Sequence, residues 1–155
     1  MARLHCPPPV PVDSKAFMSA DPKLLLPKVE RMAGVFLAKC AKAGLPLLIT
    51  QTLRTKAEQD KLYAQGRTAP GKIVTNAKGG DSFHNYGVAF DVCFFVNKRA
   101  SYTGDWEKIG KIAESIGLEW GGRWSKFVDK PHFSYTAGYS LEDFKKKKVD
   151  MKKFL

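Results

Sequence analysis

Two histidines and two aspartates lie in two short segments of the chain, His84 to Asp91 and Asp129 to His132. The sequence contains only three histidines, so two of the three share a segment with an aspartate. Asp91 is the single carboxylate in the apolar run 88–95, which is typical of a buried strand. Burying a carboxylate is costly unless it is paired or binds a metal ion. Two neutral imidazoles and one carboxylate form the ligand set of a catalytic zinc site, in which water takes the fourth position.

The spacing of these residues constrains the backbone around them. His84 precedes Asp91 by seven positions, which would place the two side chains on opposite faces of an unbroken strand. We therefore expect His84 on a loop that turns back onto the sheet, with Gly87 supplying the break. The proline between Asp129 and His132 interrupts regular pairing, so a bend there can bring both side chains to one spot. The residues alone leave a second interpretation open, in which Asp91 is a core carboxylate capped by a histidine and Asp129 is solvated.

The same residues resemble the motifs of a known family. One motif of this sequence is Ser82-x-His84-x-x-Gly87-x-Ala89-x-Asp91 followed by Asp129-x-x-His132. It resembles the motif of the zinc peptidases in the D-alanyl-D-alanine carboxypeptidase superfamily. A second segment is Tyr63-Ala-Gln-Gly-Arg67-Thr-Ala-Pro-Gly71-Lys-Ile-Val-Thr-Asn76-Ala-Lys-Gly-Gly80. It resembles the L-alanyl-D-glutamate endopeptidases, which are found as phage endolysins and related bacterial wall hydrolases. The resemblance extends from about Pro27 to Tyr135.

This resemblance implies a cofactor, a reaction and a set of roles. It implies that His84, Asp91 and His132 bind one Zn²⁺ ion and that Asp129 is the general base. The implied reaction is cleavage of the peptidoglycan stem peptide between L-alanine and D-glutamate, as in a cell-wall lysin. Two alternatives are a D-alanyl-D-alanine carboxypeptidase or dipeptidase and a catalytically silent, basic wall-binding module. The segment 66–80 argues against the first, and the complete ligand set argues against the second.

Three further residues are candidates for contact with the substrate. Arg54 belongs to the segment Arg54-Thr55-x-x-Glu58-Gln59, which resembles the arginine motif of the family. Its guanidinium is expected to hold a substrate carboxylate or a developing oxyanion, although an arginine at such a junction is commonly a surface residue. Gln59 and Ser82 are expected to bind the substrate. For Ser82, hydrogen bonding to the local backbone is the more common alternative.

The elements that position these residues follow from the hydrophobic periodicity. It predicts a single α+β domain in which a small antiparallel sheet carries the metal site and about three helices flank it. The resemblance implies the fold of the DD-peptidases and Hedgehog proteins. Helices are expected over 27–43, 55–66 and 106–117, and strands over 47–53, 88–95 and 131–135. Residues 97–104 are expected to form a turn, and 66–80 a long loop that forms the lip of the substrate cleft.

Two tryptophans and the cysteines have ordinary structural interpretations. Trp120 and Trp124 are expected to be core anchors or a wall for the substrate, with at least one of them in the core. Cys6, Cys40 and Cys93 show no CxxC spacing, so we expect reduced thiols. Cys40 and Cys93 are expected to be small core residues, and Cys93 is a weaker candidate for a metal ligand because it shares a strand face with Asp91.

Composition restricts the class of protein and its partners. The chain has 155 residues, of which 44% are hydrophobic, and a formal net charge of +11. This length suits one domain, which we divide into an N-terminal arm (1–20), a catalytic part (21–138) and a basic tail (139–155). The charge favours an anionic partner, either peptidoglycan or an anionic lipid surface. No nucleic-acid-binding signature is present, so no specific nucleic acid is expected.

The two ends of the chain suggest where it acts. The first ten residues contain no apolar signal core, so we expect the protein to stay in the host cytoplasm until lysis and then to reach the cell wall. The tail carries the lysines 145–148 and 152–153 and ends on Phe154 and Leu155. A basic amphipathic tail of this kind predicts weak contact with an anionic membrane, although such runs are usually solvated. We expect a monomer.

Overall fold

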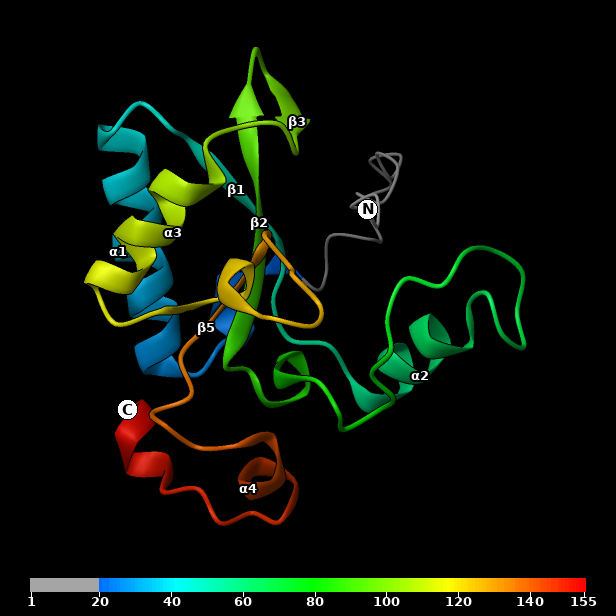
Figure 1. Cartoon of the computed structure of the whole chain (residues 1–155). Coiled ribbons are helices and arrows are strands. Elements are labelled where there is room, and N and C mark those ends of the chain that lie inside the picture. The colour runs from blue at the N-terminus through cyan, green and yellow to red at the C-terminus, as the bar shows by residue number, and fades with distance from the viewer. Residues whose placement is uncertain (1–19) are drawn as a thin grey trace.

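One antiparallel sheet forms the centre of the molecule (Figure 1). The computed structural model describes residues 20–155, so the predicted arm lies almost wholly outside the described residues, as does Cys6. The sheet has five strands in the order β1-β2-β5-β4, with β3 paired to β2. These strands are β1 (Leu47–Gln51), β2 (Ala89–Val96), β3 (Arg99–Ser101), β4 (Glu119–Trp120) and β5 (His132–Ser134). The expected pairing of the strand around His132 with the strand around Asp91 is confirmed.

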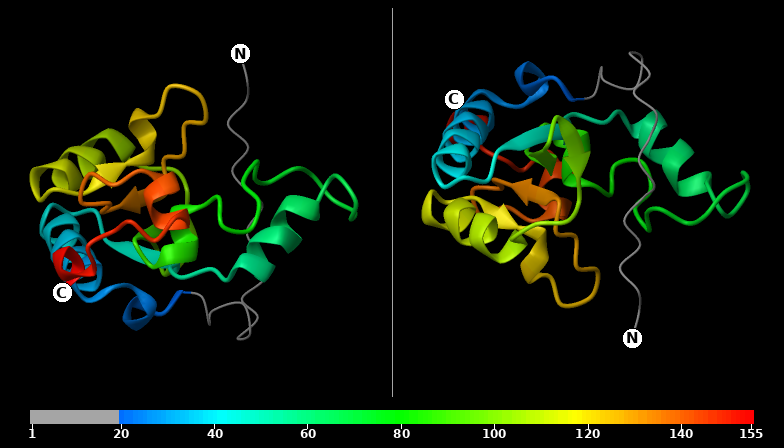
Figure 2. Two further views of the ribbon diagram at one scale, coloured as in Figure 1. Left: turned by 90° about the horizontal axis from the view of Figure 1, so that it is seen from below. Right: turned by 90° about the horizontal axis from the view of Figure 1, so that it is seen from above.

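Helices lie on two sides of this sheet. The α-helices are α1 (Pro27–Lys42), α2 (Lys56–Ala64), α3 (Trp106–Ser115) and α4 (Leu141–Lys145). Helices α1 and α3 pack side by side on one side of the sheet, whereas α2 and the loop that follows it project on the other side (Figure 1; Figure 2). The α+β, single-domain prediction is confirmed, and the short helix α4 after the cap at Ser140 also agrees with what the sequence suggests. Within the described residues, no helix is both long enough and apolar enough to cross a bilayer.

Aromatic side chains join α1 to the middle of the sheet. Phe36 of α1, Phe90 of β2 and Phe133 of β5 are fully buried, and the rings of Phe36 and Phe133 are 4.7 Å apart. Trp120 of β4 stacks on Phe133 at 6.5 Å. This core lies directly beneath the strands that carry Asp91 and His132, so it fixes their positions.

Two parts of the sheet differ from the sequence-based expectation. Residues 97–104 are not a simple turn, because β3 pairs with β2 in a hairpin. The hairpin turn has positive φ at Asn97 (50°) and Lys98 (62°), the backbone of a type I′ turn, but the second residue is not the glycine that usually signals it. Strand β1 ends at Gln51 rather than at residue 53, and its register with β2 shifts between Ile49 and Gln51.

The C-terminal segment, residues 139–155, packs against the rest of the domain. Phe154 is 1% exposed and Phe144 is 7% exposed, and their rings lie 6.0 Å apart. Arg31 of α1 donates a hydrogen bond of 2.7 Å to the main-chain oxygen of Leu155. Phe154 is therefore not available to anchor the protein in a membrane, and contact of the remaining lysines with an anionic surface stays a prediction.

The remaining cysteines behave as expected. Cys40 and Cys93 are buried free thiols, and burial raises the pKa of Cys40 to about 11. Both are therefore small apolar residues of the interior with little thiolate at neutral pH. Among the described residues, the group able to hold a metal ion does not include Cys93.

Helix α3 provides a test of the packing against Trp120. A Cβ atom on Gly110 would overlap the Trp120 indole ring, whereas one on Gly34 of α1 would meet nothing within 4 Å. Alanine favours a helix over glycine by about 1 kcal/mol, so G34A should raise Tm by roughly 2–4 °C. G110A should instead lower Tm, because overpacking costs about 1–3 kcal/mol. Thermal unfolding of the two variants checks this, and equal stabilisation of both would show that the close contact at Gly110 is wrong.

Candidate metal centre

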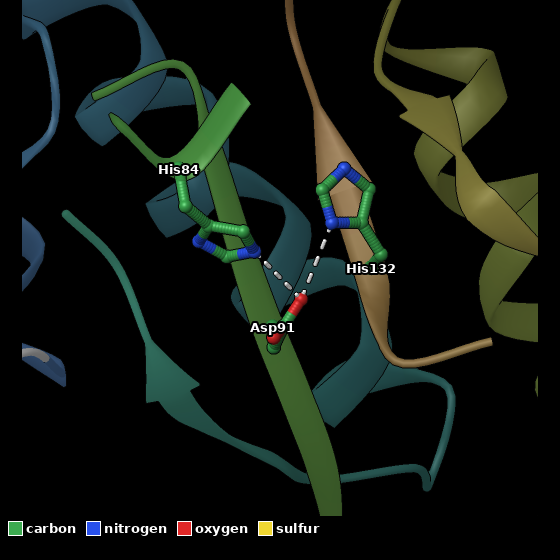
Figure 3. A group of neighbouring side chains, drawn as sticks. All are labelled: His84, Asp91 and His132. Carbon is green, nitrogen blue, oxygen red and sulfur yellow. Dashed lines mark hydrogen bonds and ion pairs between the residues drawn. The ribbon is translucent and has the colours of Figure 1, made fainter. Parts of the chain in front are cut away.

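Three side chains from two strands and a turn converge on one point (Figure 3). Asp91 of β2 and His132 of β5 are directly opposite each other in the antiparallel register. His84 lies in the 3₁₀ turn η3 (Phe83–Tyr86), which leads into β2 through Gly87 in the left-handed conformation (φ 71°). The predicted loop that turns back onto the sheet is therefore confirmed. The Asp91 Oδ1 atom lies 3.1 Å from His84 Nε2 and 3.4 Å from His132 Nδ1.

The hydrogen-bonding of these rings fits a bound cation. His84 Nδ1 lies 2.7 Å from the carbonyl oxygen of Thr52, and because a carbonyl can only accept, Nδ1 carries the proton. The Nε2 atom of a neutral His84 then directs a lone pair at Asp91 Oδ1, which also offers only lone pairs. His132 directs Nδ1 at the same oxygen. These three ligand atoms lie within 4.8 Å of one another, and a cation between them removes the clash of lone pairs.

Electrostatics separates the two carboxylates of the site. Burial alone would raise the pKa of Asp91, but the charges and hydrogen bonds of His84 and His132 hold it well below its ordinary value. For Asp129 the direction is opposite, because burial and then the charge of Asp91 raise its pKa. Two carboxylates whose pKa values are pushed apart commonly have different roles. Asp91 suits a permanently ionised ligand, and Asp129 suits a group that takes up a proton.

The loop that carries Asp129 is closed by hydrogen bonds between its two ends. The Asp129 amide donates to the Gly121 carbonyl at 3.0 Å, and the Trp120 indole donates to the Lys130 carbonyl at 2.8 Å. A Cβ on Gly121 would overlap the Asp129 carbonyl oxygen, so glycine is needed there. The predicted bend lies between Asp129 and His132, where the His132 amide donates to the Asp129 carbonyl at 3.2 Å. In this position Asp129 interacts electrostatically with both histidines and with Arg54.

Arg54 faces this site and is not a surface residue. Its amide donates to the His84 carbonyl at 3.0 Å, and its own carbonyl accepts from the Asn85 side chain at 2.9 Å. Burial lowers the pKa of Arg54, while the charges of Asp91 and Asp129 act in the opposite direction. Helix α2 begins directly after it with the predicted capping box of Thr55 and Glu58. The guanidinium is thus a partly buried cation that interacts electrostatically with the two aspartates, and it is suited to bind an anionic group.

The structure places the two other substrate candidates differently. Ser82 caps η3 by accepting a hydrogen bond from the His84 amide at 3.3 Å, so the local-backbone alternative describes its contact. Gln59 is 0% exposed, and its amide is fully engaged with Arg54, Thr75 and Ala77. Direct contact between Gln59 and a substrate, as predicted from the sequence, is therefore wrong, because the side chain offers neither surface nor a free polar atom.

Sequence reasoning missed a contact on each side of the centre. The Thr52 carbonyl, which orients His84, carries no sequence signal, because every residue has a main-chain carbonyl group. The Trp124 ring lies 4.8 Å from the His132 ring and remains 39% exposed. Trp120 is the expected core anchor at 5% exposure. Trp124 is thus the tryptophan that borders both His132 and solvent.

The long loop 66–80 is fastened to α2 along its length. Arg67 donates to the carbonyl of Tyr63 at 2.6 Å, to the carbonyl of Thr75 at 3.0 Å and to Asn76 Oδ1 at 2.9 Å. The Gly79 amide donates to Asp60 at 2.7 Å. These hydrogen bonds fix a loop that has no regular secondary structure, so the segment is an ordered wall that ends next to η3.

Comparisons with known proteins agree with this centre. Residues 75–135 match a family model described as D-alanyl-D-alanine carboxypeptidase. The chain is 42% identical over 124 residues to the peptidoglycan L-alanyl-D-glutamate endopeptidase CwlK of Bacillus subtilis, covering 72% of this chain and 73% of CwlK. It is 33% identical to the L-alanyl-D-glutamate peptidase of Listeria phage A118, covering 66% of this chain and 35% of the phage protein. The fold is similar to an L,D-carboxypeptidase, DacB of Streptococcus pneumoniae, with a TM-score of 0.57, 19% identity, and coverage of 84% and 76% of the two chains.

Proposed function

Because this chain belongs to the family of peptidoglycan L-alanyl-D-glutamate endopeptidases, we propose that it cleaves the L-alanyl-D-glutamate bond of the stem peptide with one zinc ion as cofactor. The observation that carries this proposal is the convergence of His84, Asp91 and His132, whose ligand atoms lie within 4.8 Å of one another, in a chain 42% identical to CwlK. The phage peptidase among its relatives supports a role as a lysin that leaves the host cytoplasm and acts on the wall.

The centre assigns a separate task to each residue. A zinc ion held by His84, Asp91 and His132 supplies Lewis acidity and lowers the pKa of water. Asp129, whose pKa is raised by burial, accepts the proton of the attacking water and returns it to the leaving amine. Thr52 keeps His84 in the tautomer whose Nε2 faces the site.

Arg54 and the two loops complete the substrate site. The guanidinium of Arg54 binds negative charge, either a carboxylate of the stem peptide or the charge that develops on the scissile carbonyl. The exposed edge of Trp124 forms one wall beside His132, and the fastened loop 66–80 forms the lip on the α2 side. An anionic stem peptide suits a chain with a net charge of +11.

Product analysis tests the proposed bond. Purified protein is incubated with bacterial sacculi, with and without a chelator, and the newly freed amino termini are identified. We expect D-glutamate amino termini that disappear with chelator and return with zinc. Released D-alanine would assign the protein to the carboxypeptidases of the superfamily instead. Tight binding to sacculi without cleavage would indicate a catalytically silent wall-binding module, and it would refute the roles proposed for Asp129 and Arg54.

A further inference from the structure

Gln59 is a fully buried polar side chain between the metal centre and the lip. It lies in α2, it is 0% exposed, and no step of the proposed reaction uses it. We infer that Gln59 is a positioning residue that holds the Arg54 guanidinium in its working orientation and joins it to the lip. This inference rests on the proposed function, since it concerns the residue that binds negative charge in that site.

The contacts of the Gln59 amide define its orientation. Its Oε1 accepts a hydrogen bond of 2.8 Å from Arg54 Nη1, and its Nε2 donates one of 2.8 Å to the Ala77 carbonyl. A guanidinium can only donate and a carbonyl can only accept, so the amide fits in one orientation. The Thr75 hydroxyl lies 3.4 Å from the same Nε2. Both ends of the amide are therefore assigned by their partners.

The other unbranched or aliphatic side chains of similar size do not meet both demands. Glutamate offers acceptors to Arg54 but no donor to the Ala77 carbonyl, and lysine offers donors but no acceptor. Leucine fills the space but removes the partner of a partly buried guanidinium hydrogen and of a partly buried carbonyl, which is costly. The buried position thus requires one donor and one acceptor on the same planar group, which explains why it is an amide.

Arg54 depends on this contact because its other anchors lie in the backbone. The main chain of Arg54 is bonded to His84 and Asn85 of η3, which fixes Cα but leaves the long side chain free to rotate. A flexible side chain loses several rotamers when it binds a charged group, and this loss weakens binding. A hydrogen bond to Gln59 removes that freedom before the substrate arrives.

The lip has other anchors, so the two effects of Gln59 can be separated. Gln65, at the end of α2, donates to the Lys72 carbonyl at 3.0 Å and also ties the lip to the helix. This contact does not involve Arg54, and Gln65 is partly exposed. Gln65→Leu is therefore a matched control, with the same substitution, the same helix and the same loop, but with the Arg54 contact intact.

A double-mutant cycle distinguishes positioning from a general effect on folding. Kinetics of the zinc-loaded enzyme are measured on a soluble stem peptide for wild type, Gln59→Leu, Arg54→Ala and the double variant. We expect Gln59→Leu to lower kcat/KM about 10- to 100-fold. The loss should appear in kcat or in KM, whichever of the two Arg54→Ala changes. In the Arg54→Ala background it should cost no more than about threefold. Losses that multiply would overturn the inference, as would an equal loss in Gln65→Leu.

Gln59→Glu tests which end of the amide matters. It keeps an acceptor for Arg54 and removes the donor to Ala77, so we expect a kcat/KM closer to wild type than to Gln59→Leu. A Gln59→Glu variant as impaired as Gln59→Leu would show that the tie to the lip, rather than the hold on Arg54, is what the reaction needs.

Nuclear magnetic resonance provides a readout that does not depend on activity. Hydrogens on Arg54 Nη1 that are held by Gln59 should give a signal separate from the averaged guanidinium signals, identified by its loss in Arg54→Ala. We expect the signal to disappear in Gln59→Leu and to persist in Gln59→Glu and Gln65→Leu. Its persistence in Gln59→Leu would contradict the inference even if the protein cleaved nothing. Absence of D-glutamate termini with the signal behaving as expected would refute the proposed function alone.

Discussion

Replacement of Asp129 by asparagine should lower kcat by about 10²- to 10⁴-fold while the protein still binds its metal ion. Asparagine has almost the same shape as aspartate but cannot accept a proton, so the variant removes the general base without opening a cavity. The main-chain hydrogen bond from residue 129 to Gly121 is also preserved, so the bend should remain. The measurement is the rate of release of D-glutamate amino termini, together with the zinc content of the purified variant.

Asp105→Asn is the control for this substitution. Asp105 is the N-cap of α3, where its carboxylate accepts from the Lys108 amide at 3.0 Å, and asparagine is an equally good cap. This variant should keep wild-type activity and Tm. Near-native activity of Asp129→Asn would remove Asp129 from the mechanism, and loss of zinc together with activity would indicate that it holds the metal instead.

Removal of the metal ion should abolish activity and lower the stability of the fold. Without a cation, His84 Nε2 and His132 Nδ1 both crowd the Asp91 Oδ1 atom in the interior, and these three groups lose the ion that would hold them together. A ligand present at 100 times its Kd stabilises the native state by about 2.7 kcal/mol, which corresponds to roughly 5–10 °C in Tm for a chain of this size. Calorimetry and activity are measured after chelation and again after zinc is returned.

His132→Ala separates specific binding from a general effect of the ion. It removes one of the three ligands, so returned zinc should restore neither activity nor Tm. Because metal ligands must be deprotonated, the zinc-dependent rise in Tm of the wild type should shrink in acid. Full activity in the presence of a strong chelator, with no zinc detected in the protein, would exclude the metal-dependent mechanism.

Local patterns in the sequence determined most of the scaffold and the residues of the centre. The apolar periodicity and the capping residues predicted α1, α2 and α3 to within a few positions, because a helix records its buried face and its first turn in nearby residues. The odd spacing between His84 and Asp91 required the turn that η3 provides. The motif then brought Asp129 and His132 into the same set. The structure places His84, Asp91 and His132 together, and Asp129 lies close enough to interact with them electrostatically.

The tertiary structure alone decided which polar residues face the substrate site and which support it. Gln59 reads as a polar helix residue, and only its burial beneath the lip shows that it holds Arg54. The contact of Thr52 with His84 is made by a main-chain carbonyl, which every residue possesses. Phe154 ends a lysine-rich segment, yet it lies in the core. The contact between Thr52 and His84 and those between Gln59 and the lip join residues 32, 16 and 18 positions apart, and even the nearby Arg54 meets Gln59 only through the folded conformation. Hydrogen bonds and burial depend on distance in space, which local composition does not encode.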